Sequence, residues 1–112
     1  MLGITKRKNN GMEKAEELPG ALPAVDVYEN PREFLLVADL PGVPQGAATV
    51  TLEHERLVLQ GTGALRKFRR EMVVPPSIDS EQVTASMKAG VLTVHLPKRA
   101  PYQPRQIQVR GV

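Results

Sequence analysis

Residues 85–98, ASMKAGVLTVHLPK, decide the fold of this chain. Apolar side chains stand at every second position on both sides of a short Lys-Ala-Gly segment, which is typical of a turn. The alternating positions are Val83, Ala85 and Met87 before the turn and Leu92, Val94 and Leu96 after it. Successive side chains of a strand point to opposite faces, so this period of two predicts a β-hairpin with one buried face.

The same alternation recurs upstream, with turn residues between the segments. Residues 24–29 and 67–74 each have the pattern of one strand, residues 48–61 have that of a hairpin turning at EHER, and residues 33–40 are apolar on both sides. A strand that is apolar on both faces is expected inside a sandwich. Together the seven short strands predict an all-β fold, an immunoglobulin-like β-sandwich.

The chain is predicted to be one domain with two extensions, because 112 residues supply one modest core. Residues 1–22 are polar and irregular, so we expect a flexible N-terminal arm. Residues 23–98 carry the strand pattern of the sandwich domain, and residues 99–112 form a C-terminal tail.

Composition argues against several classes of protein. The chain has no cysteine, and His54 and His95 lie far apart without metal-ligand spacing. The glycines of GTGAL lack the lysine of a phosphate-binding loop. We therefore expect no metal, no cofactor, no use of ATP and no enzymatic activity. No apolar run has the length of a membrane span or of a signal peptide, so a soluble cytoplasmic protein is expected.

Several motifs in this order resemble a known family. ADLPGV, LVLQG, FRREMVVPPSID and ASMKAGVLTVHLPK are similar to segments of the α-crystallin domain of the small heat-shock proteins, and the resemblance runs from about Pro23 to Lys98. Members of that family are ATP-independent holdases that bind partly unfolded proteins and assemble into oligomers from dimers. The resemblance therefore implies client proteins as partners and a role in the stress response.

The tail carries a short apolar motif. Three prolines, at positions 97, 101 and 104, end the last strand and stiffen the tether. Ile107 and Val109 follow where the family has its Ile/Val-x-Ile/Val motif, and two residues apart they project to the same side of an extended segment. That geometry suits strand addition at the edge of a sheet, and hence self-association through the tail. A disordered tail and a tail folded onto its own domain are the alternatives.

The resemblance also implies a groove that would receive the tail or a client. The groove is expected between the strand with Val50 and Leu52 and the strand with Val83, Ala85 and Met87. The small side chain of Ala85 would leave room for an inserted apolar side chain.

One loop departs from the family pattern. Many bacterial and plant members have some twenty residues there, including a strand that dimer partners exchange, whereas here only residues 62–66 separate Gly61 from Lys67. Five residues cannot cross to a neighbouring subunit and return. Three arrangements remain: edge-to-edge pairing of the RKFRRE strand, which places like charges together, a monomer or weak oligomer held by its tail, and one half of a hetero-assembly.

Arg70 stands five residues before Pro75, where the family has an arginine in its dimer-forming strand. It is a candidate for an ion pair at the dimer interface, and the alternative is an exposed edge charge that discourages aggregation. Residues 1–22 contain no aromatic residue, unlike the phenylalanine-rich arms of the family. We therefore expect a weaker or narrower holdase than longer-armed relatives.

Two further functions compete with the holdase. A monomeric or hetero-assembling adaptor, a co-chaperone sandwich domain that docks on other proteins, is favoured by the shortened loop and disfavoured by the tail motif. Four basic residues, at positions 66, 67, 69 and 70, suggest nucleic-acid binding as another function. A strand splits these between two faces, and the chain has only four aromatic residues for stacking. The sequence therefore argues against nucleic acid as a partner.

Overall fold

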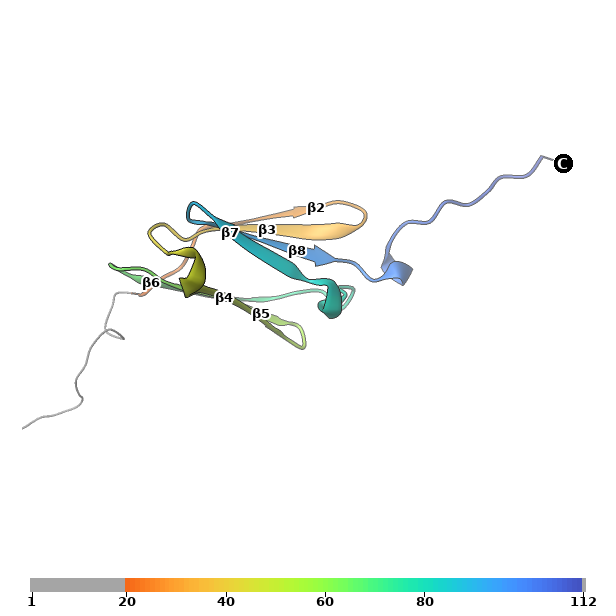
Figure 1. Cartoon of the computed structure of the whole chain (residues 1–112). Coiled ribbons are helices and arrows are strands. Elements are labelled where there is room, and N and C mark those ends of the chain that lie inside the picture. Colours follow the sequence, from red (N-terminus) through yellow and green to blue (C-terminus); the bar gives the residue numbers. More distant parts are fainter. Residues whose placement is uncertain (1–19, 112) are drawn as a thin grey trace, which may run out of the picture.

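A computed structural model describes residues 20–111, which form a two-layered β-sandwich (Figure 1). The strands are β1 (Gly20–Ala21), β2 (Val25–Glu29), β3 (Glu33–Asp39), β4 (Ala48–Glu53), β5 (Arg56–Thr62), β6 (Lys67–Val73), β7 (Thr84–Lys88) and β8 (Val91–Pro97). The helical elements of these residues are three short 3-10 turns, η2 (Gln45–Ala47), η3 (Ser80–Gln82) and η4 (Ala100–Tyr102). The predicted all-β sandwich is confirmed, and each of the seven predicted strands is present.

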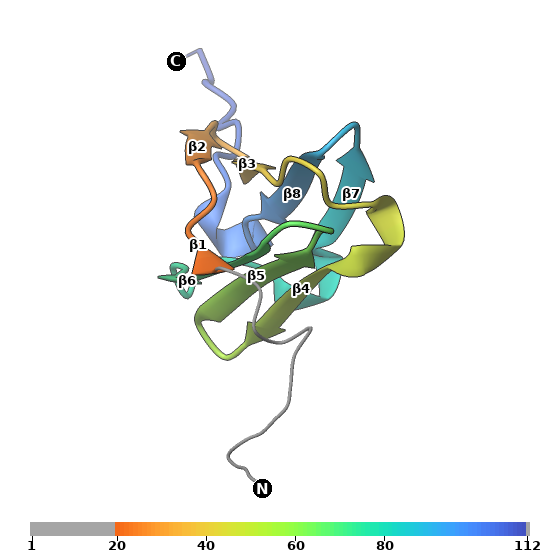
Figure 2. The same ribbon diagram turned by 90° about the vertical axis from the view of Figure 1, so that its left-hand side faces the viewer.

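The two sheets have the strand orders β1-β6-β5-β4 and β2-β3-β8-β7. All neighbouring strands are antiparallel except β1 and β6, which run parallel. Figure 2 shows β4 and β7 above one another at one side of the sandwich, and β1, β6 and β2 at the other. Each side of the sandwich is therefore a pair of edge strands, one from each sheet.

The hairpin of β7 and β8 has the predicted turn. Met87 pairs with Leu92 and Lys88 with Val91, so Ala89 and Gly90 alone form the connection. Both have positive φ angles, 52° and 78°. Such angles match the right-handed twist of the two strands, which is why glycine suits this turn.

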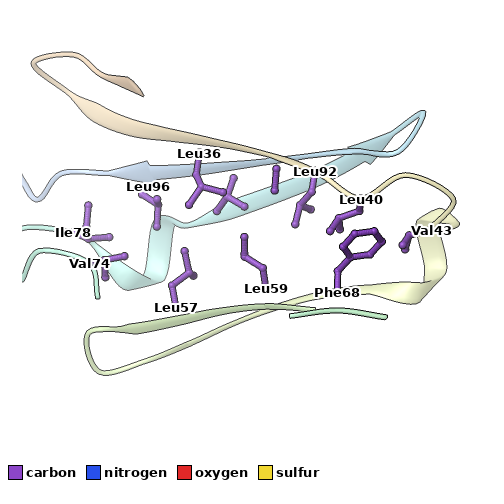
Figure 3. Packing of buried hydrophobic residues seen from close by; sticks show 12 residues of the cluster. Leu36, Leu40, Val43, Leu57, Leu59, Phe68, Val74, Ile78, Leu92 and Leu96 are labelled. Carbon is purple, nitrogen blue, oxygen red and sulfur yellow. The ribbon is translucent and has the colours of Figure 1, made fainter. Parts of the chain in front are cut away.

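The core lies between the sheets and follows the period-two pattern (Figure 3). Leu57, Leu59 and Val94 are fully buried, and their strand neighbours at odd offsets are more exposed. The remaining buried apolar residues are Leu36, Ala38, Leu40, Val43, Phe68, Val74, Ile78, Leu92 and Leu96. Burial of these side chains provides the main driving force for folding.

A strand lies in the region predicted to be an arm. The sequence placed residues 1–22 in a flexible arm, of which residues 1–19 lie outside the described part of the chain. Gly20 and Ala21 instead form β1, which pairs with Lys67 and Phe68 of β6, and Pro23 is buried. A strand of two residues held by backbone hydrogen bonds has no side-chain periodicity, so the pattern of the sequence does not reveal it.

The strand that is apolar on both sides, β3, buries only one of its faces between the sheets. Leu36 and Ala38 are buried in the core, whereas Leu35 and Val37 lie half-buried on the outer face of their sheet. β2 and β8 flank β3 on both sides. The flanking strands therefore partly shield the outer side chains, without a further layer above them.

The shortened loop is a tight hairpin between β5 and β6. The amide of Gly63 donates a hydrogen bond to the carbonyl oxygen of Arg66 (2.9 Å), which closes the turn. The turn also packs on the loop after β3, because a Cβ atom at Gly63 would lie 2.9 Å from the carbonyl oxygen of Gly42. Residues 62–66 are therefore held against their own domain.

Replacing Gly63 by alanine is expected to lower the free energy of unfolding by about 1–3 kcal/mol, because backbone must shift to admit the methyl group. Urea denaturation followed by circular dichroism measures this change. Gly46→Ala is the matched control, since a Cβ atom at Gly46 meets nothing within 4 Å. Equal stabilities of the two variants would show that the hairpin does not pack on Gly42.

Candidate functional site

A groove opens between the edge strands β4 and β7. Its volume is about 300 Å³, and it is lined by Gln45, Ala48, Val50, Ala85, Ser86, Met87 and Leu92. The strand pairing explains why apolar side chains take part in its lining: Val50 pairs with Leu59 and Ala85 with Val94, and both partners are fully buried. Val50 and Ala85 thus point toward the interior of the sandwich, yet Ala85 is exposed. The core is accessible at this edge.

The backbone of the groove's two walls is also available. β4 is paired only with β5 and β7 only with β8, within the part of the chain that the structure describes. Each wall therefore presents one unpaired edge, to which an extended peptide can add as a strand. Apolar side chains between two such edges give a site for an extended segment with apolar residues at alternate positions.

Three of the five predicted groove residues lie together. Val50, Ala85 and Met87 line the groove, whereas Leu52 lines a separate hollow and Val83 packs half-buried against the core. Leu52 and Val83 thus stand outside the groove lining in this chain. The binding role of all five residues remains a prediction.

Four residues of the groove lining were not predicted from the sequence: Gln45, Ala48, Ser86 and Leu92. Ala48 and Leu92 continue the alternations that were recognised, so the pattern could have found them. Gln45 comes from η2, a turn without periodicity. Its place beside the groove depends on how this turn packs.

The tail leaves the domain after η4 and runs away from the sandwich (Figure 1). Ile107 is 74% exposed and Val109 is 90% exposed, and neither lines the groove of its own chain. The two apolar side chains of the motif are therefore open to another molecule, and the tail does not adopt the alternative folded onto its own domain.

Arg70 lies on the inner face of β6, between Phe68 and Met72, and is half-buried. Its Nη1 atom donates to the carbonyl oxygen of Pro23 at 3.2 Å, which ties β6 to the segment between β1 and β2. The alternative of an exposed edge charge is therefore wrong in a single chain. The proposed ion pair across a dimer interface stays a prediction.

Edge-to-edge pairing of β6 with its twin meets an obstacle. β1 pairs with Lys67 and Phe68, so the start of the β6 edge is already occupied. Complete pairing of this strand with a second copy would require β1 to leave.

The basic residues of β6 do not form a uniform patch. Arg69 lies 2.5 Å from the carboxylate of Glu71, and Arg56 lies 3.5 Å from it. The hydrogen bond and charge of Arg69 hold the pKa of Glu71 below its usual value. This acidic partner disfavours the binding of a phosphate backbone here.

The two histidines have different surroundings. His95 Nδ1 lies 3.0 Å from Glu33 Oε1 on the outer face of the sheet, with 46% of its side chain exposed. His54 stands at the β4–β5 turn with a φ angle of 57°. Within residues 20–111, no group of three or more potential ligands could hold a metal ion, and no helix is both long and apolar enough to cross a membrane.

Comparison with known proteins identifies the family. Residues 26–110 match the Hsp20/alpha crystallin family. The chain is 35% identical to spore protein SP21 of Stigmatella aurantiaca, with 81% of this chain and 63% of that protein covered. It is 32% identical to a probable 15 kDa heat shock protein of Leptospira interrogans, with 88% and 85% covered.

Solved structures lead to the same family. A small heat-shock protein from Xylella fastidiosa, described as having a distinct high order structure, is similar with a TM-score of 0.65 and 33% identity, over 80% of this chain and 96% of that one. The heat shock protein 16.0 of Schizosaccharomyces pombe shares the fold with a TM-score of 0.67, over 81% and 77% of the two chains. This chain therefore belongs to the Hsp20/alpha crystallin family of small heat-shock proteins.

Proposed function

We propose that this protein is an ATP-independent holdase that binds partly unfolded proteins and assembles by docking the tail of one chain in the groove of another. The observation that carries the proposal is the open groove between β4 and β7, whose lining includes the apolar side chains of Val50, Ala85 and Met87, in a chain whose own tail motif is exposed. The tail offers apolar side chains and the groove has apolar side chains in its lining, but the two do not meet within one chain.

Family membership supports a chaperone role, with non-covalent binding as its activity. The groove suits unfolded chains for a physical reason: backbone edges are the same for every sequence, while the apolar lining selects segments that a folded protein buries. Such a site recognises extended apolar segments in general. In this proposal the protein acts in the cytoplasm.

The strength of one tail contact is limited. Burial of two branched side chains contributes about 3–6 kcal/mol, and ordering four or five tail residues costs on the order of 5 kcal/mol. A single contact is therefore weak and exchangeable, while several contacts in one assembly act together. Release of a tail opens the same groove to a client.

The hairpin of residues 62–66 limits how dimers form. It is closed by the hydrogen bond from Gly63 to Arg66 and packs on Gly42. With only five residues, the hairpin also lacks the length to exchange a strand with a partner. The tail contact is the assembly contact that we propose for this chain.

The same hairpin favours a second function, that of an adaptor that docks on other proteins as a monomer or in a hetero-assembly. Deletion of residues 104–112 separates the two proposals. A holdase assembled through tails loses its assembly on deletion, whereas a monomeric adaptor keeps its size in solution.

The holdase proposal predicts that the protein suppresses the aggregation of a heat-labile client without nucleotide. Light scattering at the client's unfolding temperature, with equimolar protein, is expected to fall by more than about half, because the groove covers apolar segments that otherwise associate. An equal mass of an unrelated folded protein is the control. Undiminished scattering, with the protein itself folded by circular dichroism, would contradict the holdase and leave the adaptor.

A further inference from the structure

Gln103 holds the root of the tail. Its Oε1 atom accepts a hydrogen bond from Arg32 Nη1 at 3.0 Å, and its Nε2 atom donates to the carbonyl oxygen of Lys98 at 2.7 Å. Gln103 is half-buried, whereas the other residues of the stretch 99–111 are all exposed. Both ends of its amide are thus used, six residues beyond the end of β8. We call the contacts of Gln103 with Arg32 and Lys98 the tail clamp.

The partners of Gln103 in the tail clamp are themselves held by hydrogen bonds of the β2–β3 turn and of Lys98. The Oδ1 atom of Asn30 accepts from the amides of Arg32 and Glu33, which shapes the β2–β3 turn. The amide of Lys98 donates to the carbonyl oxygen of Arg32 at 2.9 Å, and Lys98 Nζ lies 2.7 Å from a carboxylate oxygen of Glu29. The clamp therefore joins the tail to backbone that the sheet already holds.

The local backbone then determines the direction in which the tail leaves. Pro101 lies at the start of η4, and Gln103 has φ −94° and ψ 149°, the extended conformation that a following proline favours. Pro104 is that following residue. Clamp and prolines together direct the chain away from the sandwich (Figure 1).

The clamp also shortens the reach of the motif. From Gln103 to Ile107 there are four residue steps, which span at most about 14 Å, whereas the nine steps from Lys98 span about 32 Å. The groove residue Ala85 pairs with Val94, four residues before Lys98. It therefore lies roughly 15 Å from Lys98, along β8 and one strand spacing across.

The clamp and the groove are on opposite sides of β8. Arg32 belongs to the β2–β3 turn, and in the order β2-β3-β8-β7 the groove strand β7 lies beyond β8. A clamped tail would need to extend fully and bend back across β8 to bring Ile107 to its own groove. With the clamp open, the tail is free from Lys98 onward and can span about twice the distance from Lys98 to Ala85.

From these observations we propose that the tail clamp is a positioning device that makes tail docking intermolecular. This inference rests on the proposed docking of the tail in the groove. With the clamp closed, the nearest groove that the motif can fill belongs to another chain. With the clamp open, the tail of a chain competes for its own groove at high effective concentration, and assembly weakens.

Disulfide trapping tests this inference, because the chain has no cysteine of its own. Ser86→Cys places a thiol on the edge strand β7 beside the groove, on the face opposite Ala85. Gln108→Cys places one between the two motif residues, on the face opposite Ile107 and Val109, so the two thiols lie on the same side when the tail adds to β7 as a strand. After oxidation, non-reducing gels and mass spectrometry separate bonds between chains from bonds within one chain. In the parent pair we expect bonds between chains.

Gln103→Ala, added to the cysteine pair, is expected to raise the share of bonds within one chain at least about threefold, and to raise by a similar factor the concentration needed for assembly. Arg32→Ala removes the other partner and should act alike. Gln106→Ala is the matched control, since Gln106 is an exposed glutamine of the same tail. It should behave like the parent pair.

Two results would overturn the inference, and they are distinguishable. If bonds form between chains and both clamp variants match Gln106→Ala, the tail docks but the clamp does not direct it. If no variant forms a bond between groove and tail, the docking itself is absent, and the proposed assembly fails together with the clamp.

Discussion

Replacement of both Ile107 and Val109 by serine is expected to dissociate the proposed tail-linked assembly into single chains. The two side chains are apolar groups of the tail beyond η4, and both are exposed. Their loss removes the apolar burial of every tail contact, about 3–6 kcal/mol each. Because the contacts act together, this loss in every contact removes the whole assembly. Size-exclusion chromatography with light scattering measures the mass.

The neighbouring glutamines provide the matched control. Gln106→Ser with Gln108→Ser changes the same tail by the same number of residues, and both glutamines are exposed. In an extended segment these positions face away from the motif. The control variant should keep the mass of the parent protein. Assembly that survives the change of Ile107 and Val109 would refute the tail contact.

Replacement of Ala85 by tryptophan is expected to weaken tail binding more than tenfold. Ala85 points inward, as its pairing with buried Val94 shows, but is exposed because it lies at the sheet edge. A bulky side chain there occupies the space that an inserted Ile or Val would need. Fluorescence anisotropy of a labelled peptide of residues 103–111 measures the affinity, in a chain that carries the two tail serines so that its own tail does not compete.

Thr84→Trp is the control for bulk. Thr84 precedes Ala85 in β7, is exposed, and pairs with His95 on the outer face of the sheet. The same side chain one residue earlier thus points away from the groove. Equal loss of binding in both variants would place the peptide on the outer face, and no loss in either would place it away from β7.

The period-two pattern shows how far local sequence could predict this protein. It identified seven strands, and it placed hairpin turns at EHER (53–56) and at Lys88 to Gly90. Alternation is a local property that each strand carries in its own residues, and burial of one face of β5 and of β8 confirms it. The family followed from the order and spacing of the same segments.

The strand β1 and Arg70 show where local sequence was insufficient. β1 has two residues and is defined by its backbone partner β6. The contact of the Arg70 guanidinium with the carbonyl oxygen of Pro23, 47 residues away in the chain, was not predicted. Neither contact has a periodic signature, because each depends on which segments the sheets bring together.

The sequence by itself determined the strands, the sandwich, the family and the apolar tail motif, because each of these is encoded in residues that are close along the chain. Only the tertiary structure decided which edges face each other and which residues line the groove, with Val50 and Ala85 included and Leu52 and Val83 outside. It also decided that Gln103 meets Arg32, 71 residues away. Such contacts between distant segments follow from the packing of two twisted sheets, which no local pattern specifies.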